Sequence, residues 1–355
     1  MNADALWLLL STVDSGGLVG ESTKPDQVDP RTLEAALDLA KVNGLHYAFV
    51  QSWIAVGGQL PEREASRRAG DRRAIAGLQS SIDILNDVSQ ELGIDYAVIK
   101  DVQTIDHVPR DLDIFVPEAD RKSFLEGLLS RGYAFVYNDG AEVALGRPRS
   151  MRIDVYSRIH YLGRDFLDEA YLLGASAAEE RHGRTYPGLT PEAAFLLDSI
   201  HGIFGHGAIS LLDFLELRNL RIRAGDDGRL RVRAATFGWA GVYDLWRQRL
   251  SVLSTRVFIQ RIPTEFPNRI DARFLLEAVG QLDGDRFTSR DRIALRASVA
   301  WDRIILLGET TGIQDRLVRS ALVRSLANAA GHRLRTFRGD RKNGLRAIKR
   351  AREGG

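Results

Sequence analysis

Residues 96–116 constrain the fold of this chain most, because they place two carboxylates on a short apolar segment. The stretch reads YAVIKDVQTIDHVPRDLDIFV, with Asp111 and Asp113 one residue apart in DLDIFV. Successive side chains of a strand point to opposite faces, so in a strand the two aspartates share one face and the apolar side chains take the other. Paired carboxylates are costly to desolvate without a cation, and hard divalent cations prefer oxygen ligands. The stretch therefore predicts a magnesium site at the start of a buried strand.

A third carboxylate follows on the segment MRIDVYSRI. If this segment is also a strand, Arg152, Asp154 and Tyr156 share one face, with Ile153 and Val155 on the other. An isolated Asp among apolar neighbours is costly to bury, and a partner, either a metal ion or an arginine, would explain its position. The upstream pair of aspartates favours the metal.

The pattern elsewhere is mainly helical. Apolar residues recur at three- and four-residue steps over residues 72–92, and Gly93 then ends the pattern as a helix C-cap would. The stretch YAFVYNDGAEVALG predicts a hairpin turned at residues 138–140, and GDDGRLRVR predicts a turn or hairpin. Further helices are expected at residues 3–13, 30–57, 118–131, 190–207, 210–223, 239–261, 272–282, 290–307 and 314–329.

These patterns predict an α+β fold in four parts. A small mixed-sheet core at residues 93–162 is expected between an N-terminal helical region at residues 1–92, packed on the core, and a large helical domain at residues 163–330. Residues 331–355 form a basic tail with nine Lys/Arg against two Asp/Glu, although the whole chain has a net charge of only +2. Such a tail is either a solvated end or a contact for nucleic acid.

The composition excludes several kinds of site. Without cysteine there is no disulfide, no thiolate zinc site and no cysteine nucleophile, so any metal must be held by oxygen or imidazole. No apolar run approaches the roughly 20 residues that cross a bilayer, and the run at residues 6–10 lacks the basic leading segment of a secretory signal. We expect a cytoplasmic protein with no membrane contact.

Several segments together resemble the polymerase-β-like nucleotidyltransferase superfamily, and more closely its broad, uncharacterised prokaryotic nucleotidyltransferase branch. The resemblance covers roughly residues 30–220. The segments that carry it are LDLAKVNGLHYAFVQSWI, ELGIDYAVIK, DLDIFV preceded by an arginine, RGYAF, IDVYSRIHY and SIHGIFGH.

This resemblance implies an enzyme that moves a nucleoside monophosphate from a nucleoside triphosphate, with ATP among the candidates, to a hydroxyl group and releases pyrophosphate. Asp111 and Asp113 would hold two magnesium or manganese ions. Asp154 would bind the catalytic metal and help to deprotonate the acceptor hydroxyl. The acceptor, which is a small molecule, an RNA or a protein, stays undefined.

Two cations close to the aspartates are candidate ligands of the triphosphate. They are Lys100 and Arg110, and ion pairing with Asp101 or Asp106 is the alternative role for both. Members of the superfamily usually carry Gly-Ser, Gly-Gly or Lys-Gly on the loop after the first strand, so that backbone amides approach the phosphates. Here Lys100 is followed by Asp101, and no glycine precedes Arg110. A carboxylate at this point would repel a triphosphate.

Two other functions are compatible with the sequence. A sugar-nucleotide glycosyltransferase also uses a DxD motif and a divalent metal, but there the acidic pair follows an apolar strand, whereas here it opens one. A catalytically degenerate nucleotidyltransferase domain that binds RNA or a protein partner through the basic tail would account for the loop without glycine.

Overall fold

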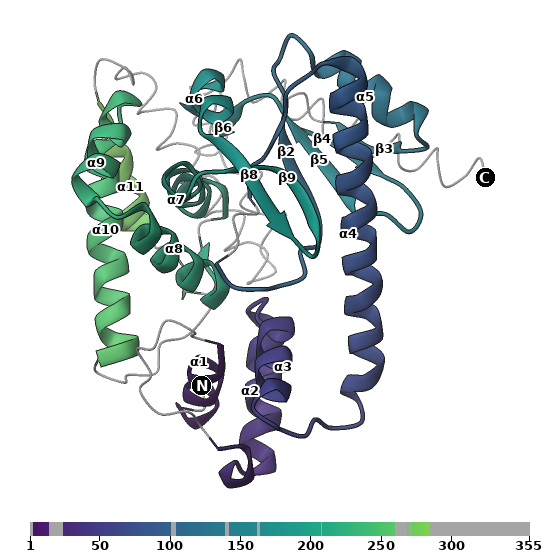
Figure 1. Ribbon diagram of the computed structural model, residues 1–355. Helices are drawn as coiled ribbons and strands as arrows, with labels where there is room; N and C mark the ends of the chain where they lie inside the picture. Colours follow the sequence, from purple (N-terminus) through teal and green to yellow (C-terminus); the bar gives the residue numbers. More distant parts are fainter. Residues whose placement is uncertain are drawn as a thin grey trace, which may run out of the picture.

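Seven strands form one mixed sheet around which the described part of the chain is arranged (Figure 1). The computed structural model describes residues 3–13, 24–100, 104–138, 142–161, 164–206, 208–259, 268–269 and 272–283. The strand order is β3-β4-β5-β2-β1-β9-β8. The strands are β1 (Ala97–Val98), β2 (Asp111–Phe115), β3 (Ala134–Asn138), β4 (Glu142–Gly146), β5 (Arg152–Tyr156), β8 (Ser176–Arg181) and β9 (Arg184–Leu189).

The central strands β2 and β5 run parallel, whereas β2 pairs antiparallel with β1 and β5 pairs antiparallel with β4. In both central strands, apolar and polar side chains alternate between the two faces of the sheet, as the sequences predict. Leu112 and Ile114 of β2, with Ile153 and Val155 of β5, are completely or almost completely buried. The opposite face of the same strands carries the polar side chains.

The apolar face of the central strands packs against α4 (Glu64–Leu92) and α5 (Arg121–Ser130). The predicted stripe of α4 lies in this contact, and Leu78, Ile82 and Leu85 have no exposed surface. Gly93 ends α4 with a positive φ of 65°, a conformation that glycine adopts without steric cost. The sequence pattern thus placed this layer correctly.

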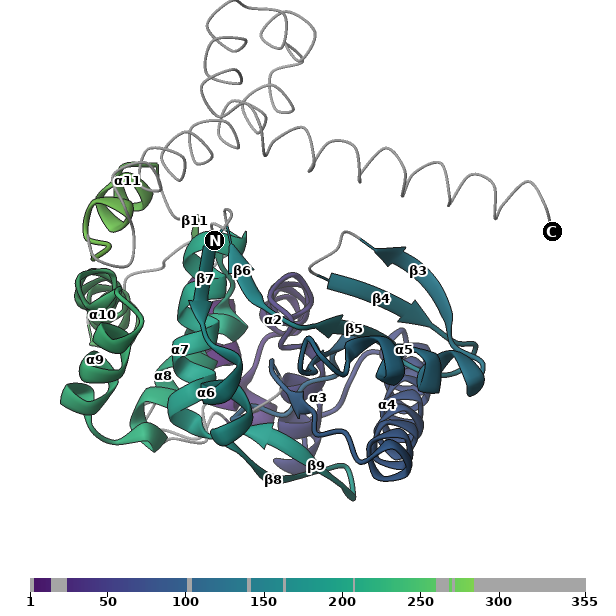
Figure 2. The same ribbon diagram turned by 90° about the horizontal axis from the view of Figure 1, so that it is seen from above.

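The polar face turns toward a second, larger group of helices. Its core contains Ala97, Ile99, Phe115 and Leu189 from the strands and loops of the sheet. Figure 2 shows α7 and α8 on the side of the sheet away from α4. The helices of this group are α1 (Ala3–Val13), α2 (Pro30–Val42), α3 (His46–Ala55), α6 (Glu169–Gly174), α7 (Pro191–Ile200), α8 (Leu211–Ala224), α9 (Asp227–Thr236), α10 (Ala240–Ser254) and α11 (Ala272–Gly280).

Short elements complete the description. Two π-helical turns, His201–His206 and Thr255–Ile259, follow α7 and α10, and a 3-10 turn, Pro25–Gln27, precedes α2. Two small two-stranded sheets pair β6 (Ile159–Tyr161) with β7 (Arg164–Leu167) and β10 (Ala208–Ile209) with β11 (Asn268–Arg269).

The structure is mixed α/β and agrees with the predicted α+β class. The hairpin expected before residue 147 is present as β3 and β4, with residues 139–141 outside the described part. The helix expected at residues 30–57 is two helices, because the chain turns at Gly44, where φ is 75°. The expected turn or hairpin at residues 225–233 is wrong: this stretch forms most of α9, which Asp226 caps by accepting a hydrogen bond from the Gly228 N–H.

The expectation that residues 163–190 are mainly helical is also wrong. Here β8 and β9 add two strands to the sheet beside β1. Their turn is His182-Gly183, and both residues have positive φ, at 46° and 73°. A two-residue turn with two positive φ values matches the twist of a hairpin. The sheet therefore extends beyond residue 162, and the division into domains stays a prediction.

No helix in the described part of the chain is long and apolar enough to span a bilayer. The predicted cytoplasmic location stays a prediction. The helices expected at residues 290–307 and 314–329, and the basic tail at residues 331–355, lie outside the described residues.

Candidate active site

The three aspartates singled out in the sequence lie on one face of two neighbouring strands. Asp111 and Asp113 alternate with buried residues on β2, and Asp154 does so on β5. The parallel pairing places Asp113 directly opposite Asp154 and Asp111 opposite Arg152. Neighbouring strands are about 4.8 Å apart, so these side chains are close neighbours. The predicted shared face is therefore present.

Burial increases steadily across this group. The exposed fraction of the side chain is 32% for Asp111 and 12% for Asp113. It falls to 3% for Asp154. The most costly carboxylate to ionise is therefore the one on β5, at the bottom of the site.

Two cations pair with the three carboxylates. The Arg152 guanidinium bridges Asp111 and Asp154: its Nη2 donates to Asp111 Oδ2 and lies 2.6 Å from Asp154 Oδ2. Lys100 Nζ lies 3.2 Å from Asp113 Oδ1 and 4.9 Å from the centre of the Tyr156 ring. Asp154 is thus paired with an arginine, one of the two kinds of partner expected for it, and its role as a metal ligand stays a prediction.

Burial raises the pKa of Asp154 to about 6, and the negative charges of Asp113 and Glu142 add to this shift, whereas Arg152 opposes it. Its Oδ2 is bonded to Arg152, but its buried Oδ1 receives no hydrogen bond from any described residue. Burial also raises the pKa of Tyr156, with Asp113 and Glu142 contributing. The bottom of the site thus has a carboxylate oxygen with unused capacity to accept a proton or a cation.

Two acidic residues near this face were missed in the sequence. Glu142 of β4 stands opposite Tyr156, on the neighbour of β5. Asp198 of α7 has a pKa raised well above its ordinary value by burial, and Asp213, Glu216 and Asp113 add to the shift. A signal was present for Asp198, since it follows the apolar run AAFLL within the helix PEAAFLLDSI, well after the acidic Glu192 of the first turn.

The loop between β1 and β2 is held from the helical side. Glu216 of α8 accepts hydrogen bonds from the backbone N–H groups of Thr104 and Ile105, at 2.8 and 3.0 Å, and from the Thr104 hydroxyl. Arg181 of β8 donates from Nη2 to the His107 carbonyl. Two separate elements, α8 and β8, thus anchor the loop that follows Lys100, and neither contact was evident in the sequence.

The two candidate phosphate ligands differ in position. Lys100 lies at the site, paired with Asp113. Arg110 is exposed and directly precedes the first aspartate of β2. Asp106, one of the two proposed ion-pair partners, faces His182 at 3.7 Å. The other, Asp101, falls in residues 101–103, outside the described part of the chain.

As the side chains stand, no three His, Asp or Glu residues within the described ranges form a group that could hold a metal ion. The donor chemistry nevertheless suits a hard divalent cation, because three carboxylates share one face and Asp154 Oδ1 has no hydrogen-bond partner among the described residues. Arg152 occupies the space between two of them, and its side chain is 45% exposed. Asp111, Asp113 and Asp154 are thus the candidate metal ligands, and a metal there would require the Arg152 guanidinium to leave the space between Asp111 and Asp154.

No family model matches the chain, and no curated protein matches it. Among solved structures, a lincosamide antibiotic adenylyltransferase, LnuA, with lincomycin bound, aligns over 39% of this chain and 92% of its own, with 16% identity and a TM-score of 0.29. At that TM-score the likeness supports neither a shared fold nor a shared activity.

Proposed function

We propose that this protein is a metal-dependent nucleotidyltransferase that moves a nucleoside monophosphate from a nucleoside triphosphate to a hydroxyl group of an acceptor. The observation that supports this most is the pairing of Asp113 with Asp154 across parallel strands, with Asp111 on the same face. Three carboxylates fixed by a sheet are a rigid set of oxygen ligands, and phosphoryl transfer depends chiefly on positioning and charge stabilisation.

The carboxylates are proposed to hold magnesium or manganese. Such a metal, when bound, supplies charge stabilisation to the attacking and leaving oxygens. With a pKa raised to about 6, Asp154 is mainly ionised at neutral pH and still basic enough to accept the proton of the acceptor hydroxyl. Its Oδ1, which has no hydrogen-bond partner among the described residues, is the atom proposed for this role.

The cations are proposed to exchange their partners when nucleotide binds. Lys100 is paired with Asp113, and Arg152 with Asp111 and Asp154, so both are already at the site. If the carboxylates take a metal instead, both side chains become available to the triphosphate, with Arg110 beside them. Arginine is suited to this because its guanidinium makes bidentate contacts to phosphate.

Incubation with α-labelled nucleoside triphosphates and magnesium or manganese tests this function. Candidate acceptors are the protein itself, RNA and a panel of small hydroxylated compounds. Metal-dependent transfer of label is expected, and it should be lost in Asp113→Asn and Asp154→Asn. Asp83→Asn, an exposed carboxylate of α4 paired with Arg184, is the matched control and should transfer like the wild type. Label transfer that survives both site variants would contradict the assignment.

One observation favours the second candidate function, a catalytically degenerate domain that binds RNA or a protein partner. Arg152 and Lys100 already pair with the three aspartates, so two protein cations offset part of the charge that a metal would otherwise balance. Under this alternative, the basic tail at residues 331–355 makes the contact, and its deletion should flatten the salt dependence of RNA binding. An unchanged salt dependence would remove that role.

A further inference from the structure

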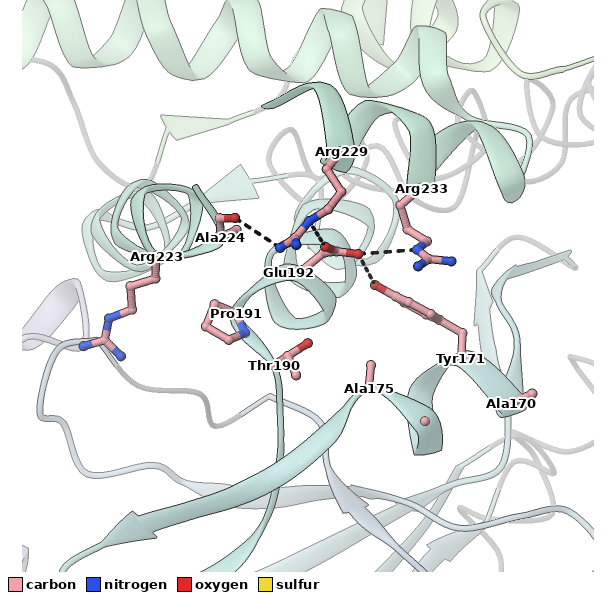
Figure 3. Close-up of a pocket in the computed structure, with 11 residues that line it drawn as sticks. Ala170, Tyr171, Ala175, Thr190, Pro191, Glu192, Arg223, Ala224, Arg229 and Arg233 are labelled. Atoms are coloured by element: carbon pink, nitrogen blue, oxygen red, sulfur yellow. Dashed lines mark hydrogen bonds and ion pairs between the residues drawn. The ribbon is translucent and has the colours of Figure 1, made fainter. Parts of the chain in front are cut away.

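A cavity of about 400 Å³ lies apart from the aspartates, between α6, the start of α7, the end of α8 and α9 (Figure 3). None of Asp111, Asp113 and Asp154 lines it. Cavities of a few hundred Å³ are of the size that holds a small metabolite. Its polar lining consists of Tyr171, Thr190, Glu192, Arg223, Arg229 and Arg233.

The lining is cationic, with three arginines against one glutamate. Glu192, whose side chain is only 13% exposed, is held between two of them. Arg229 Nε lies 2.7 Å from its Oε2, and Arg233 Nε lies 3.3 Å from its Oε1. One carboxylate therefore fixes two guanidinium groups and leaves the lining with a net positive charge.

The contacts of Arg229 and Arg233 leave some of their N–H donors unused. Each guanidinium has five N–H donors, and both arginines use Nε for Glu192. Arg229 makes one further contact, from Nη2 to the Ala224 carbonyl at 3.3 Å. Terminal N–H groups of both arginines thus remain for an anion, which a guanidinium binds in bidentate fashion.

The guanidinium of Arg233 is also held from the side, because it lies 5.0 Å from the centre of the Tyr171 ring. The Tyr171 hydroxyl approaches Glu192 Oε1 at 3.5 Å. The two arginines are therefore oriented before any ligand arrives, which lowers the entropy cost of binding.

The rest of the lining supplies a hydroxyl group, a further positive charge and apolar surface. The Thr190 hydroxyl makes no capping hydrogen bond to α7, although Thr190 is the N-cap residue of that helix. Arg223 points away from the Glu192 group in Figure 3, so it contributes positive potential and no direct chelation. Tyr171, Ala170 and Ala175 supply apolar surface beside the cationic group.

We propose that this cavity binds a small organic molecule carrying a phosphate group. The excess positive charge of the lining matches a phosphate monoester dianion, whereas a carboxylate would balance less of it. The volume exceeds the need of the phosphate alone, so the rest of the ligand lies against Tyr171 and the neighbouring alanines. This site is independent of the proposed nucleotidyl transfer.

Isothermal titration calorimetry of the full chain in EDTA tests the proposal, because EDTA removes any metal through which the phosphate probes could bind at the aspartates. The probes are inorganic phosphate, phenyl phosphate and benzoate. Saturable binding of one phenyl phosphate per chain is expected, weaker binding of inorganic phosphate, and the weakest binding of benzoate. Arg229→Gln and Arg233→Gln should each weaken phenyl phosphate by about tenfold or more.

The matched control is Arg231→Gln, which removes the same charge from the same helix. Arg231 pairs with Asp244 at 2.9 Å and does not line the cavity, so binding should stay close to that of the wild type. Three results would overturn the proposal: no saturable binding, an equal loss in Arg231→Gln, or benzoate binding as tight as phenyl phosphate. Both test arginines are more than 40% exposed, at 60% and 44%, so the variants are expected to fold, and unfolding in urea checks this.

Discussion

Asp113 and Asp154 stand directly opposite each other on the parallel strands β2 and β5. This pairing brings together two carboxylates that are 41 positions apart in the sequence, with Asp154 almost fully buried. Lys100 pairs with Asp113, and Arg152 pairs with Asp154. The four side chains define the site whose chemistry the following predictions test.

The buried carboxyl of Asp154 should make stability depend on pH. Its pKa in the folded protein is raised to about 6, so folding favours the protonated carboxyl. The stability that this preference adds is lost as the pH rises through about 6. In EDTA, the free energy of unfolding of the wild type should fall by on the order of 2 kcal/mol relative to that of Asp154→Asn between about pH 4 and pH 7. Urea unfolding of both proteins across this range measures it, with Asp83→Asn as the control. Parallel stability curves would contradict the prediction.

Arg152 should act as the counter-ion that a metal replaces. Arg152→Gln leaves Asp111 and Asp154 without their cation. We therefore expect the free energy of unfolding in EDTA to fall by about 1–2 kcal/mol, a range that already allows for the partial exposure of the arginine. Manganese should then raise the melting temperature of the variant more than that of the wild type.

The control for this change is Arg158→Gln, since Arg158 is exposed and follows the same strand. It should show neither effect. A variant that is destabilised but gains nothing from manganese would indicate that Arg152 has only a structural role, as the degenerate alternative requires.

Glu216 should fix the loop that follows Lys100. Its carboxylate accepts from two backbone N–H groups, so Glu216→Ala leaves them without a partner and should cost about 2 kcal/mol. Hydrogen exchange of the Thr104 and Ile105 amides should become faster. Glu126→Ala, in which an exposed carboxylate of α5 is removed, should leave both amides unchanged. Unchanged exchange in Glu216→Ala would show that the loop is held by other contacts.

The turn between β8 and β9 should depend on glycine for its backbone conformation. Gly183 has φ of 73° and open space where a Cβ would lie, so Gly183→Ala should cost about 1 kcal/mol through backbone strain alone. Gly174 also has open space but no positive φ, and Gly174→Ala is the control, expected to be neutral or slightly stabilising. Equal free energies of unfolding for the two variants would contradict this explanation.

The sequence predicted the elements whose pattern is local and strong. The alternation in DLDIFV and MRIDVYSRI gave β2 and β5 and the shared face of their aspartates. The apolar stripe of residues 72–92 gave most of α4, which begins earlier, at Glu64. In each case, the period of the apolar residues decided the element and the face that it buries.

Elements and contacts that depend on distant partners were not predictable. Strands β8 and β9 have little apolar alternation of their own and are defined by pairing with each other and, for β9, with β1, so the sequence pattern predicts a helical region at residues 176–189. Glu142 and Glu216 reach the site from β4 and α8, and only the order of the strands and the packing of the helices bring them there. For Asp154 the sequence favours a metal ion over an arginine as the partner, whereas the described side chains pair it with Arg152, two residues earlier on the same strand.

Direct measurement of manganese binding tests the central claim, that Asp111, Asp113 and Asp154 together hold a divalent metal. Free Mn²⁺ is measured by electron paramagnetic resonance during titration of the full chain, with and without a non-hydrolysable ATP analogue. We predict saturable binding that the analogue strengthens and that Asp113→Asn and Asp154→Asn each weaken by about tenfold or more, with Asp83→Asn unchanged. No saturable binding, or binding that both site variants retain, would contradict the claim.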